Sequence, residues 1–174
     1  VRLNHHAASA DFSGYGHVVI ATSVTPRMPA IPNIEHPKVI GYIDAIEGRK
    51  PVGKKVALIG AGGIGFDVAE LLSHGGGDEL ESYRKEWGID INYTGNRGGL
   101  AAPVMPPPSR ELWLLQRKQT KVGDGLAKTT GWARRLLLQK RGVHMLGGCE
   151  YLKIDDAGLH LRVNGEERLL PVDT

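Results

Sequence analysis

Cysteine is nearly missing from this chain: Cys149 is the single one among 174 residues. One cysteine excludes an internal disulfide framework and any metal or iron–sulfur site built only from cysteines of this chain. It also indicates a reducing, cytoplasmic compartment. No apolar run approaches the ~20 residues of a membrane-spanning helix, and the N-terminus has no secretory pattern. We therefore expect neither membrane insertion nor export.

Aromatic residues and excess charge are also scarce. Aromatics make up 6% of the chain, and the formal net charge is only +3. This balance argues against a dedicated nucleic-acid binder, but it is compatible with a small anionic ligand. The histidines are scattered without the spacing of a zinc site, and no Ser–His–Asp arrangement stands out. Metal-dependent and hydrolytic chemistry therefore have no support, and no catalytic residue is assigned.

Hydrophobic patterning predicts an α/β fold. Apolar, β-branched runs followed by turn residues indicate strands, and helical spacing follows two of the turns. A hairpin or meander is expected near the C-terminal end. Together these predict a three-layer α/β unit with an antiparallel β flap. The predicted strands are His17–Thr22, Lys55–Ile59, Glu111–Gln116 and Val143–Leu146, and the predicted hairpin covers residues 151–163. The first predicted helix covers residues 66–72 and is ended by Gly75-Gly76-Gly77. The second is capped by Thr129 or Thr130, extends to Lys140 and is closed by Gly142.

The remaining segments divide the chain. Four prolines between residues 26 and 37 predict an extended crossover, followed by a brief helix capped by Asp44. Residues 75–109 are polar and rich in glycine and proline, which predicts a functional loop or an inserted lobe. The chain begins on Val1 without a methionine and ends at Thr174 after an apolar run. These ends suggest a portion of a longer protein.

The glycine pattern is the strongest functional signal. It lies between a predicted buried strand and an amphipathic helix, the context that a dinucleotide loop requires. Gly60 allows the tight turn, Gly62 lets a pyrophosphate approach the backbone, and Gly65 lets helix and strand pack closely. The alternative is a glycine-rich turn that binds nothing. With this motif, the predicted α/β unit is a Rossmann-like dinucleotide-binding domain with an antiparallel β flap. The predicted cofactor-binding segment is Gly60-Ala61-Gly62-Gly63-Ile64-Gly65.

The end of the next strand indicates which dinucleotide would bind. An NAD site places an acid there for the ribose 2′-hydroxyl, but this chain has Arg117 and Lys118. Guanidinium and ammonium groups pair with a 2′-phosphate, so we expect NADP(H). The alternative is a solvated basic pair. Arg117 follows Gly60 at much more than the ~20 residues of the simple unit, so segment 75–109 must loop out.

Several stretches together resemble a known family. Residues 55–67, 86–90, 115–118 and 125–132 are similar to bacterial NADPH-dependent 2,4-dienoyl-CoA reductases, flavoproteins of the trimethylamine dehydrogenase group. The resemblance implies that residues 1–50 are a partial FAD-domain segment with a crossover. It also implies that 51–174 are an NADP(H)-binding domain with an insertion at 75–109. In the full-length enzyme, FAD, FMN and a 4Fe-4S cluster would relay electrons from NADPH to an acyl-CoA substrate in fatty acid metabolism.

The same resemblance has limits within this chain. The family's Ala-Thr-Gly is Ala21-Thr22-Ser23 here, and its catalytic acids have no counterparts. The alternatives are the nucleotide domain of a related amine or N-methyl-compound dehydrogenase, and a vestigial fold. Further candidates to contact the nucleotide are Lys121, Lys128, Thr129 and Thr130, although the two threonines could instead cap a helix and the nearby Trp132 could pack in the core. A solvated helix face is expected for Arg134, Arg135, Lys140 and Arg141. Cys149 is expected to be buried.

Overall fold

The computed structural model describes residues 1–75 and 79–174. Three parallel strands form a central sheet in the order β1-β2-β3, and three antiparallel strands form a second sheet in the order β4-β5-β6. The predicted strands from residue 55 onward are therefore confirmed, as is the antiparallel flap. Their bounds are β1 Lys55–Ile59, β2 Glu111–Leu115, β3 His144–Leu146, β4 Cys149–Asp155, β5 Gly158–Val163 and β6 Glu166–Leu170.

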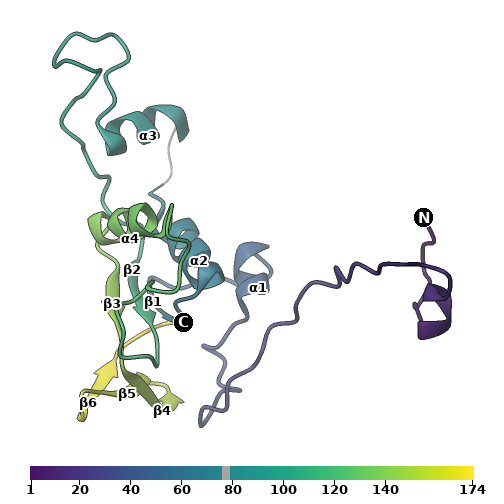
Figure 1. Cartoon of the computed structure of the whole chain (residues 1–174). Coiled ribbons are helices and arrows are strands. Elements are labelled where there is room, and N and C mark those ends of the chain that lie inside the picture. The colour runs from purple at the N-terminus through teal and green to yellow at the C-terminus, as the bar shows by residue number, and fades with distance from the viewer. Residues whose placement is uncertain (76–78) are drawn as a thin grey trace.

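Two helices cover one face of the parallel sheet, and the antiparallel sheet covers the other (Figure 1). The helices are α2 (Gly63–Ser73) and α4 (Gly131–Lys140). Each face of the parallel sheet has its own hydrophobic core. Successive side chains along a strand point to opposite faces, so alternate residues of the same strand contribute to the two cores. Leu114 packs with the helices, whereas Leu115 packs with the antiparallel sheet. The three-layer α/β prediction is thus confirmed.

The helix ends differ in detail from the prediction. Thr130 occupies the N-cap position of α4, but it makes no side-chain capping hydrogen bond. Asp44 lies in the first turn of the short helix α1 (Tyr42–Ile46) and does not cap it, because Gly41 is the N-cap. Gly142 follows α4 with a φ of 75°, as expected of a glycine closing a helix. Helix α2 ends at Ser73, and Gly76 and Gly77 lie outside the described residues.

Residues 79–109 form a lobe that projects from the body and contains helix α3 (Glu79–Trp87), which the sequence did not predict (Figure 1). Because this lobe loops out, β1 and β2 pair residue for residue from Lys55 with Glu111 to Ile59 with Leu115. The lobe thus loops out between β1 and β2, as the prediction for Arg117 required.

A buried ion pair attaches this lobe to the body. Arg141 Nε and Nη2 donate to the two carboxylate oxygens of Glu86 at 2.5 and 2.8 Å, and both side chains are 6% exposed. Arg141 also donates to the carbonyl oxygen of Glu70 at 3.2 Å, near the end of α2. The prediction of a solvated face was wrong for Arg141, since burial of its charge depends on a partner distant in sequence. Lys140 is exposed as expected.

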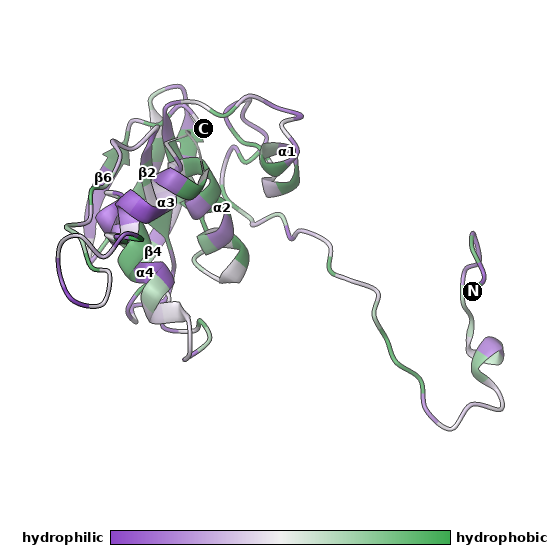
Figure 2. Cartoon of the chain, turned by 90° about the horizontal axis from the view of Figure 1, so that it is seen from above, coloured by the Kyte–Doolittle hydropathy of each residue, from purple (hydrophilic) through white to green (hydrophobic). Residues whose placement is uncertain are grey.

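The N-terminal arm runs away from the body, with hydrophobic residues along it (Figure 2). It contains one short 3-10 helix, Ser9–Phe12. The predicted strand His17–Thr22 is wrong: these residues have no regular structure, and Val19 and Ile20 are 89% and 81% exposed. A strand needs a neighbour for its backbone hydrogen bonds, and no described segment pairs with this one.

Farther along, the crossover is attached to the antiparallel sheet. Ile31 is buried in the core beneath that sheet. The backbone N–H of Ile154 donates to the carbonyl oxygen of Pro32 at 3.1 Å, and the Asn33 amide donates to the carbonyl oxygen of Ile154 at 3.0 Å. Among the described residues, no helix has the length and apolar character needed to cross a membrane.

Candidate dinucleotide site

The glycine loop joins β1 to α2 at the carboxyl edge of the parallel sheet. Gly60 has a φ of 118°, a conformation that favours glycine. Its backbone N–H donates to the carbonyl oxygen of Leu115 at 2.9 Å. This hydrogen bond ties the start of the loop to the last residue of β2, so the loop and the residues following β2 share one edge.

Gly65 is required by close packing. A Cβ atom at this position would lie 1.8 Å from the carbonyl oxygen of Gly60 and 2.9 Å from its carbonyl carbon. The first turn of α2 therefore packs directly on the backbone of the strand-to-helix turn. This is the close helix–strand contact expected for the last glycine of the pattern.

Gly62 and Gly63 meet open space. A Cβ at either position would have no neighbour within 4 Å. Gly62 is the N-cap of α2 without a side-chain hydrogen bond, and the first turn has no acidic residue. The first backbone N–H groups of a helix lack intrahelical partners and carry its positive dipole end. These residues therefore fit a pyrophosphate that approaches the backbone.

A cavity of about 480 Å³ adjoins this loop. Gly60 and Gly62 line one part of it, and Ile59, Tyr42 and Pro29 line others. The cavity thus runs from the glycine loop along β1 to the crossover. Its size lies in the range of small-molecule sites, ~300–1,000 Å³. Its lining is mostly apolar, and its polar parts include the loop backbone, Arg27 and Lys38.

Arg117 and Lys118 follow β2 at the same edge, and both are exposed. Within the described part of the chain, neither forms an ion pair with a carboxylate. Burial raises the pKa of the neighbouring Tyr151 well above its usual value, and the charge of Arg117 acts in the opposite direction. Arg117 therefore lies close to the start of the antiparallel sheet, with its guanidinium free to pair with an anion.

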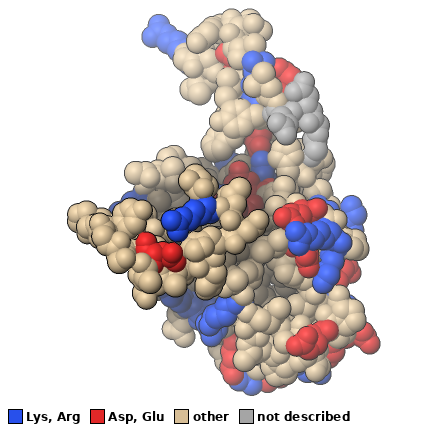
Figure 3. Space-filling model, turned by 90° about the vertical axis from the view of Figure 1, so that its right-hand side faces the viewer, with Lys and Arg blue, Asp and Glu red and all other residues tan. Residues whose placement is uncertain are grey.

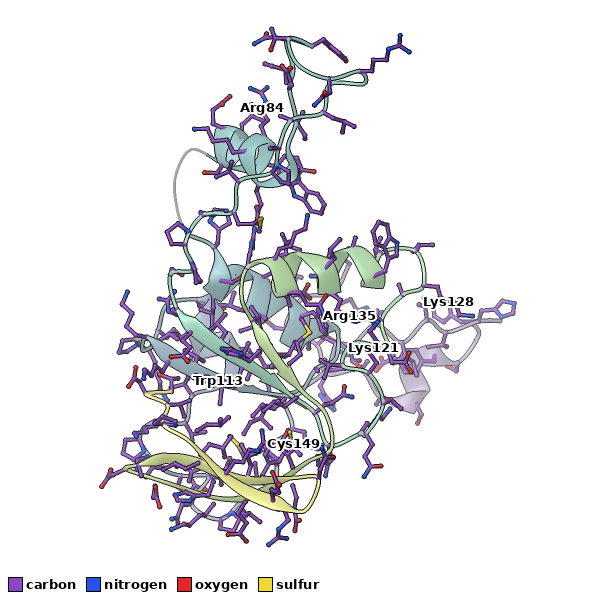
Figure 4. All side chains as sticks on the ribbon, turned by 90° about the vertical axis from the view of Figure 1, so that its left-hand side faces the viewer. Arg84, Trp113, Lys121, Lys128, Arg135 and Cys149 are labelled. Atoms are coloured by element: carbon purple, nitrogen blue, oxygen red, sulfur yellow. The ribbon has the colours of Figure 1, made fainter. Side chains whose placement is uncertain are left out.

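The connection from β2 to α4 carries further cations. Lys121 and Lys128 lie on this loop, and both are exposed (Figure 4). On the face drawn in Figure 3, basic and acidic side chains are interspersed, without one continuous basic surface. The loop lies against the first turn of α2, because a Cβ at Gly123 would lie 2.6 Å from the ring of Phe66.

Other residues of this region have structural partners. The Trp132 indole is 63% exposed and donates to the carbonyl oxygen of Thr129 at 3.1 Å, which excludes the alternative that it packs in the core. Arg135 donates to the carbonyl oxygens of Val122 and Gly123 at 2.8 and 3.1 Å. Arg134 pairs with two carboxylates on α2. These arginines are therefore not a solvated face, because the loop and α2 lie against α4.

Gln116 is a residue of the site that the sequence analysis did not identify. The Gln116 side chain donates to two carbonyl oxygens of the loop that carries Arg117 and Lys118. Its place at the end of β2, where an acid is otherwise expected, was the available signal.

Cys149 is buried, as expected, and burial raises the pKa of its thiol. Within the described ranges, no group of three or more His, Cys, Asp or Glu residues could hold a metal ion.

The parallel sheet, its helices and the glycine loop together define a Rossmann-type fold. No model of a known protein family matches the sequence. The chain is 26% identical over 170 residues to a metal reductase of Desulforamulus reducens, covering 92% of this chain and 23% of that relative. It therefore spans less than a quarter of the length of this curated relative.

Solved structures share the fold. One is 2-naphthoyl-CoA reductase in complex with 2-naphthoyl-CoA, with a TM-score of 0.62, 18% identity, and coverage of 88% of this chain and 18% of that one. Another is the ferredoxin reductase of the CYP199A2 system from Rhodopseudomonas palustris, with a TM-score of 0.51, 21% identity, and coverage of 91% and 33%. At these identities the likeness establishes the Rossmann-type fold.

Proposed function

We propose that this chain is the NADP(H)-binding part of a flavin-dependent oxidoreductase. The observation that carries the proposal is the shared edge of β1 and β2. There an open glycine turn lies beside two cations that have no carboxylate partner among the described residues. The segment from Gly60 to Gly65 holds the pyrophosphate, while Arg117 and Lys118 pair with the 2′-phosphate. The reductases with the same fold support the oxidoreductase class.

The cofactors supply the redox chemistry, and this chain supplies position. NADPH, when bound, provides a hydride that FAD accepts. The chain orients the nucleotide by its backbone N–H groups and by the charges following β2. Residues 1–50 are proposed as part of the FAD domain, and 51–174 as the nucleotide domain with its insertion at 75–109.

The proposed substrate of the complete enzyme is a 2,4-dienoyl-CoA thioester, reduced in the β-oxidation of unsaturated fatty acids. Two observations support an acyl-CoA: the resemblance of four sequence stretches to dienoyl-CoA reductases, and a solved structure with the same fold that contains a CoA thioester. FMN, a 4Fe-4S cluster and the substrate would be held by parts of the enzyme outside these residues. A related amine dehydrogenase is the alternative, and NADPH oxidation by the complete protein distinguishes the two.

Calorimetric titration with NADP⁺ and NAD⁺ tests the nucleotide assignment. We expect NADP⁺ to bind more tightly than NAD⁺, and Arg117→Ala to weaken NADP⁺ binding by about 10- to 150-fold, since a charge-assisted hydrogen bond contributes about 1.5–3 kcal/mol. NAD⁺ binding should stay unchanged in this variant. Lys140→Ala, an exposed cation on α4, is the matched control. Preference for NAD⁺ would contradict the role of Arg117, and a folded chain that binds neither nucleotide would favour a vestigial fold.

A further inference from the structure

We infer that Gln116 is the positioning residue that makes this edge select a 2′-phosphate. It holds the turn carrying Arg117 and Lys118 in place. The inference rests on the proposed function, because it concerns the same nucleotide site. It assigns the selection to a neutral amide as well as to the two cations.

The Gln116 side chain holds the turn from within. Its Nε2 donates to the carbonyl oxygen of Thr120 at 2.6 Å and to that of Lys118 at 3.1 Å. The Lys118 carbonyl also accepts the backbone N–H of Gly148 at 2.8 Å. The side-chain amide of Gln116 thus binds two carbonyl oxygens of the same loop. These hydrogen bonds stabilise a turn immediately after Arg117 and Lys118.

The backbone of Gln116 is held as firmly. Its N–H donates to the carbonyl oxygen of Leu146, and its carbonyl accepts the N–H of Cys149, both at 2.9 Å. A Cβ at Gly147 would lie 3.1 Å from the carbonyl oxygens of both Lys118 and Thr120, so the turn folds tightly over that glycine. Gln116 is half-buried between these segments. The direction of the following side chains is therefore tied to the sheet through this residue.

The turn requires a hydrogen-bond donor at position 116, because the two groups that face this side chain are carbonyl oxygens. An ionised carboxylate has only acceptors, so a glutamate at this position would face two other acceptors and release the turn. The end of the second strand is also where an acid receives the ribose 2′-hydroxyl of NAD and repels a 2′-phosphate. Gln116 thus removes the group that would favour NAD and aims the cations that favour NADP.

The test uses the full 174-residue chain and measures the dissociation constants of NADP⁺ and NAD⁺. In Gln116→Met, which keeps the size and loses the donor, we expect NADP⁺ binding to weaken about tenfold while NAD⁺ binding stays the same. In Gln116→Glu we expect a larger loss for NADP⁺ and unchanged or tighter NAD⁺ binding. Asn96→Asp, the same amide-to-carboxylate change at an exposed position of the projecting lobe, should change neither constant.

A double-mutant cycle separates positioning from a general structural role. If Gln116 acts through Arg117, then Gln116→Met should change NADP⁺ binding much less in the Arg117→Ala background than in the unmodified chain. Equal weakening of both nucleotides by Gln116→Met, or an unchanged ratio of their dissociation constants, would overturn the inference while leaving the proposed function intact. Failure of the unmodified, folded chain to bind either nucleotide would overturn both.

Discussion

Alanine at position 65 is expected to disrupt both the packing of α2 and nucleotide binding. The added Cβ would lie 1.8 Å from the carbonyl oxygen of Gly60, and that neighbour is backbone, which cannot rotate away as a side chain can. The helix must therefore shift from the strand-to-helix turn. Overpacking typically costs about 1–3 kcal/mol, and we expect Gly65→Ala to lower the free energy of unfolding by the upper end of this range.

The same shift moves the N–H groups that face the pyrophosphate. We therefore expect at least a 100-fold loss of NADP⁺ affinity, measured by calorimetry alongside denaturant unfolding. Gly63→Ala separates the two effects: its Cβ meets open space, so stability should be kept while close approach of the pyrophosphate is blocked. Gly16→Ala, which also meets open space but lies in the N-terminal arm, is the control for both measurements. Normal affinity and stability in Gly65→Ala would contradict the close-packing argument.

Removal of Arg141 is expected to cause the largest loss of stability. Glu86 and Arg141 are each 6% exposed and joined by two hydrogen bonds. Removing one partner leaves the other charge buried without compensation, which costs about 3–5 kcal/mol. Arg141→Ala should therefore lower the midpoint of urea unfolding strongly. It should also expose the lobe to proteolysis between α3 and β2, since the pair attaches α3 to the end of α2.

Two further variants test this explanation. The double variant Glu86→Leu with Arg141→Met removes both charges and should recover much of the stability, because a buried ion pair can often be replaced by apolar residues at little cost. Arg162→Ala removes a half-buried arginine that pairs with the exposed Glu150 and Glu167, and it should cost less than about 1 kcal/mol. A single Arg141→Ala variant as stable as Arg162→Ala would show that the pair does not attach the lobe.

The strands from Lys55 onward and the flap were predictable because their signals are local. Alternating or continuous apolar residues report burial on one or both faces of a strand, and glycines mark turns that need particular backbone conformations. The glycine pattern and the basic pair were visible for the same reason. Helix α3 was not predicted, since its residues are mostly polar and its buried residue Glu86 depends on an arginine 55 positions away.

The sequence by itself determined the order of the strands and of helices α2 and α4 from Lys55 onward, the glycine turn and the absence of an acid following β2. These depend on residue type and short-range spacing, which act within a few residues. The tertiary structure decided what depends on partners distant along the chain. It left His17–Thr22 without a pairing strand, buried Arg141 against α3, and placed the Gln116 amide under the turn that carries Arg117 and Lys118. A hydrogen bond or ion pair of this kind requires two groups that only the folded backbone brings together.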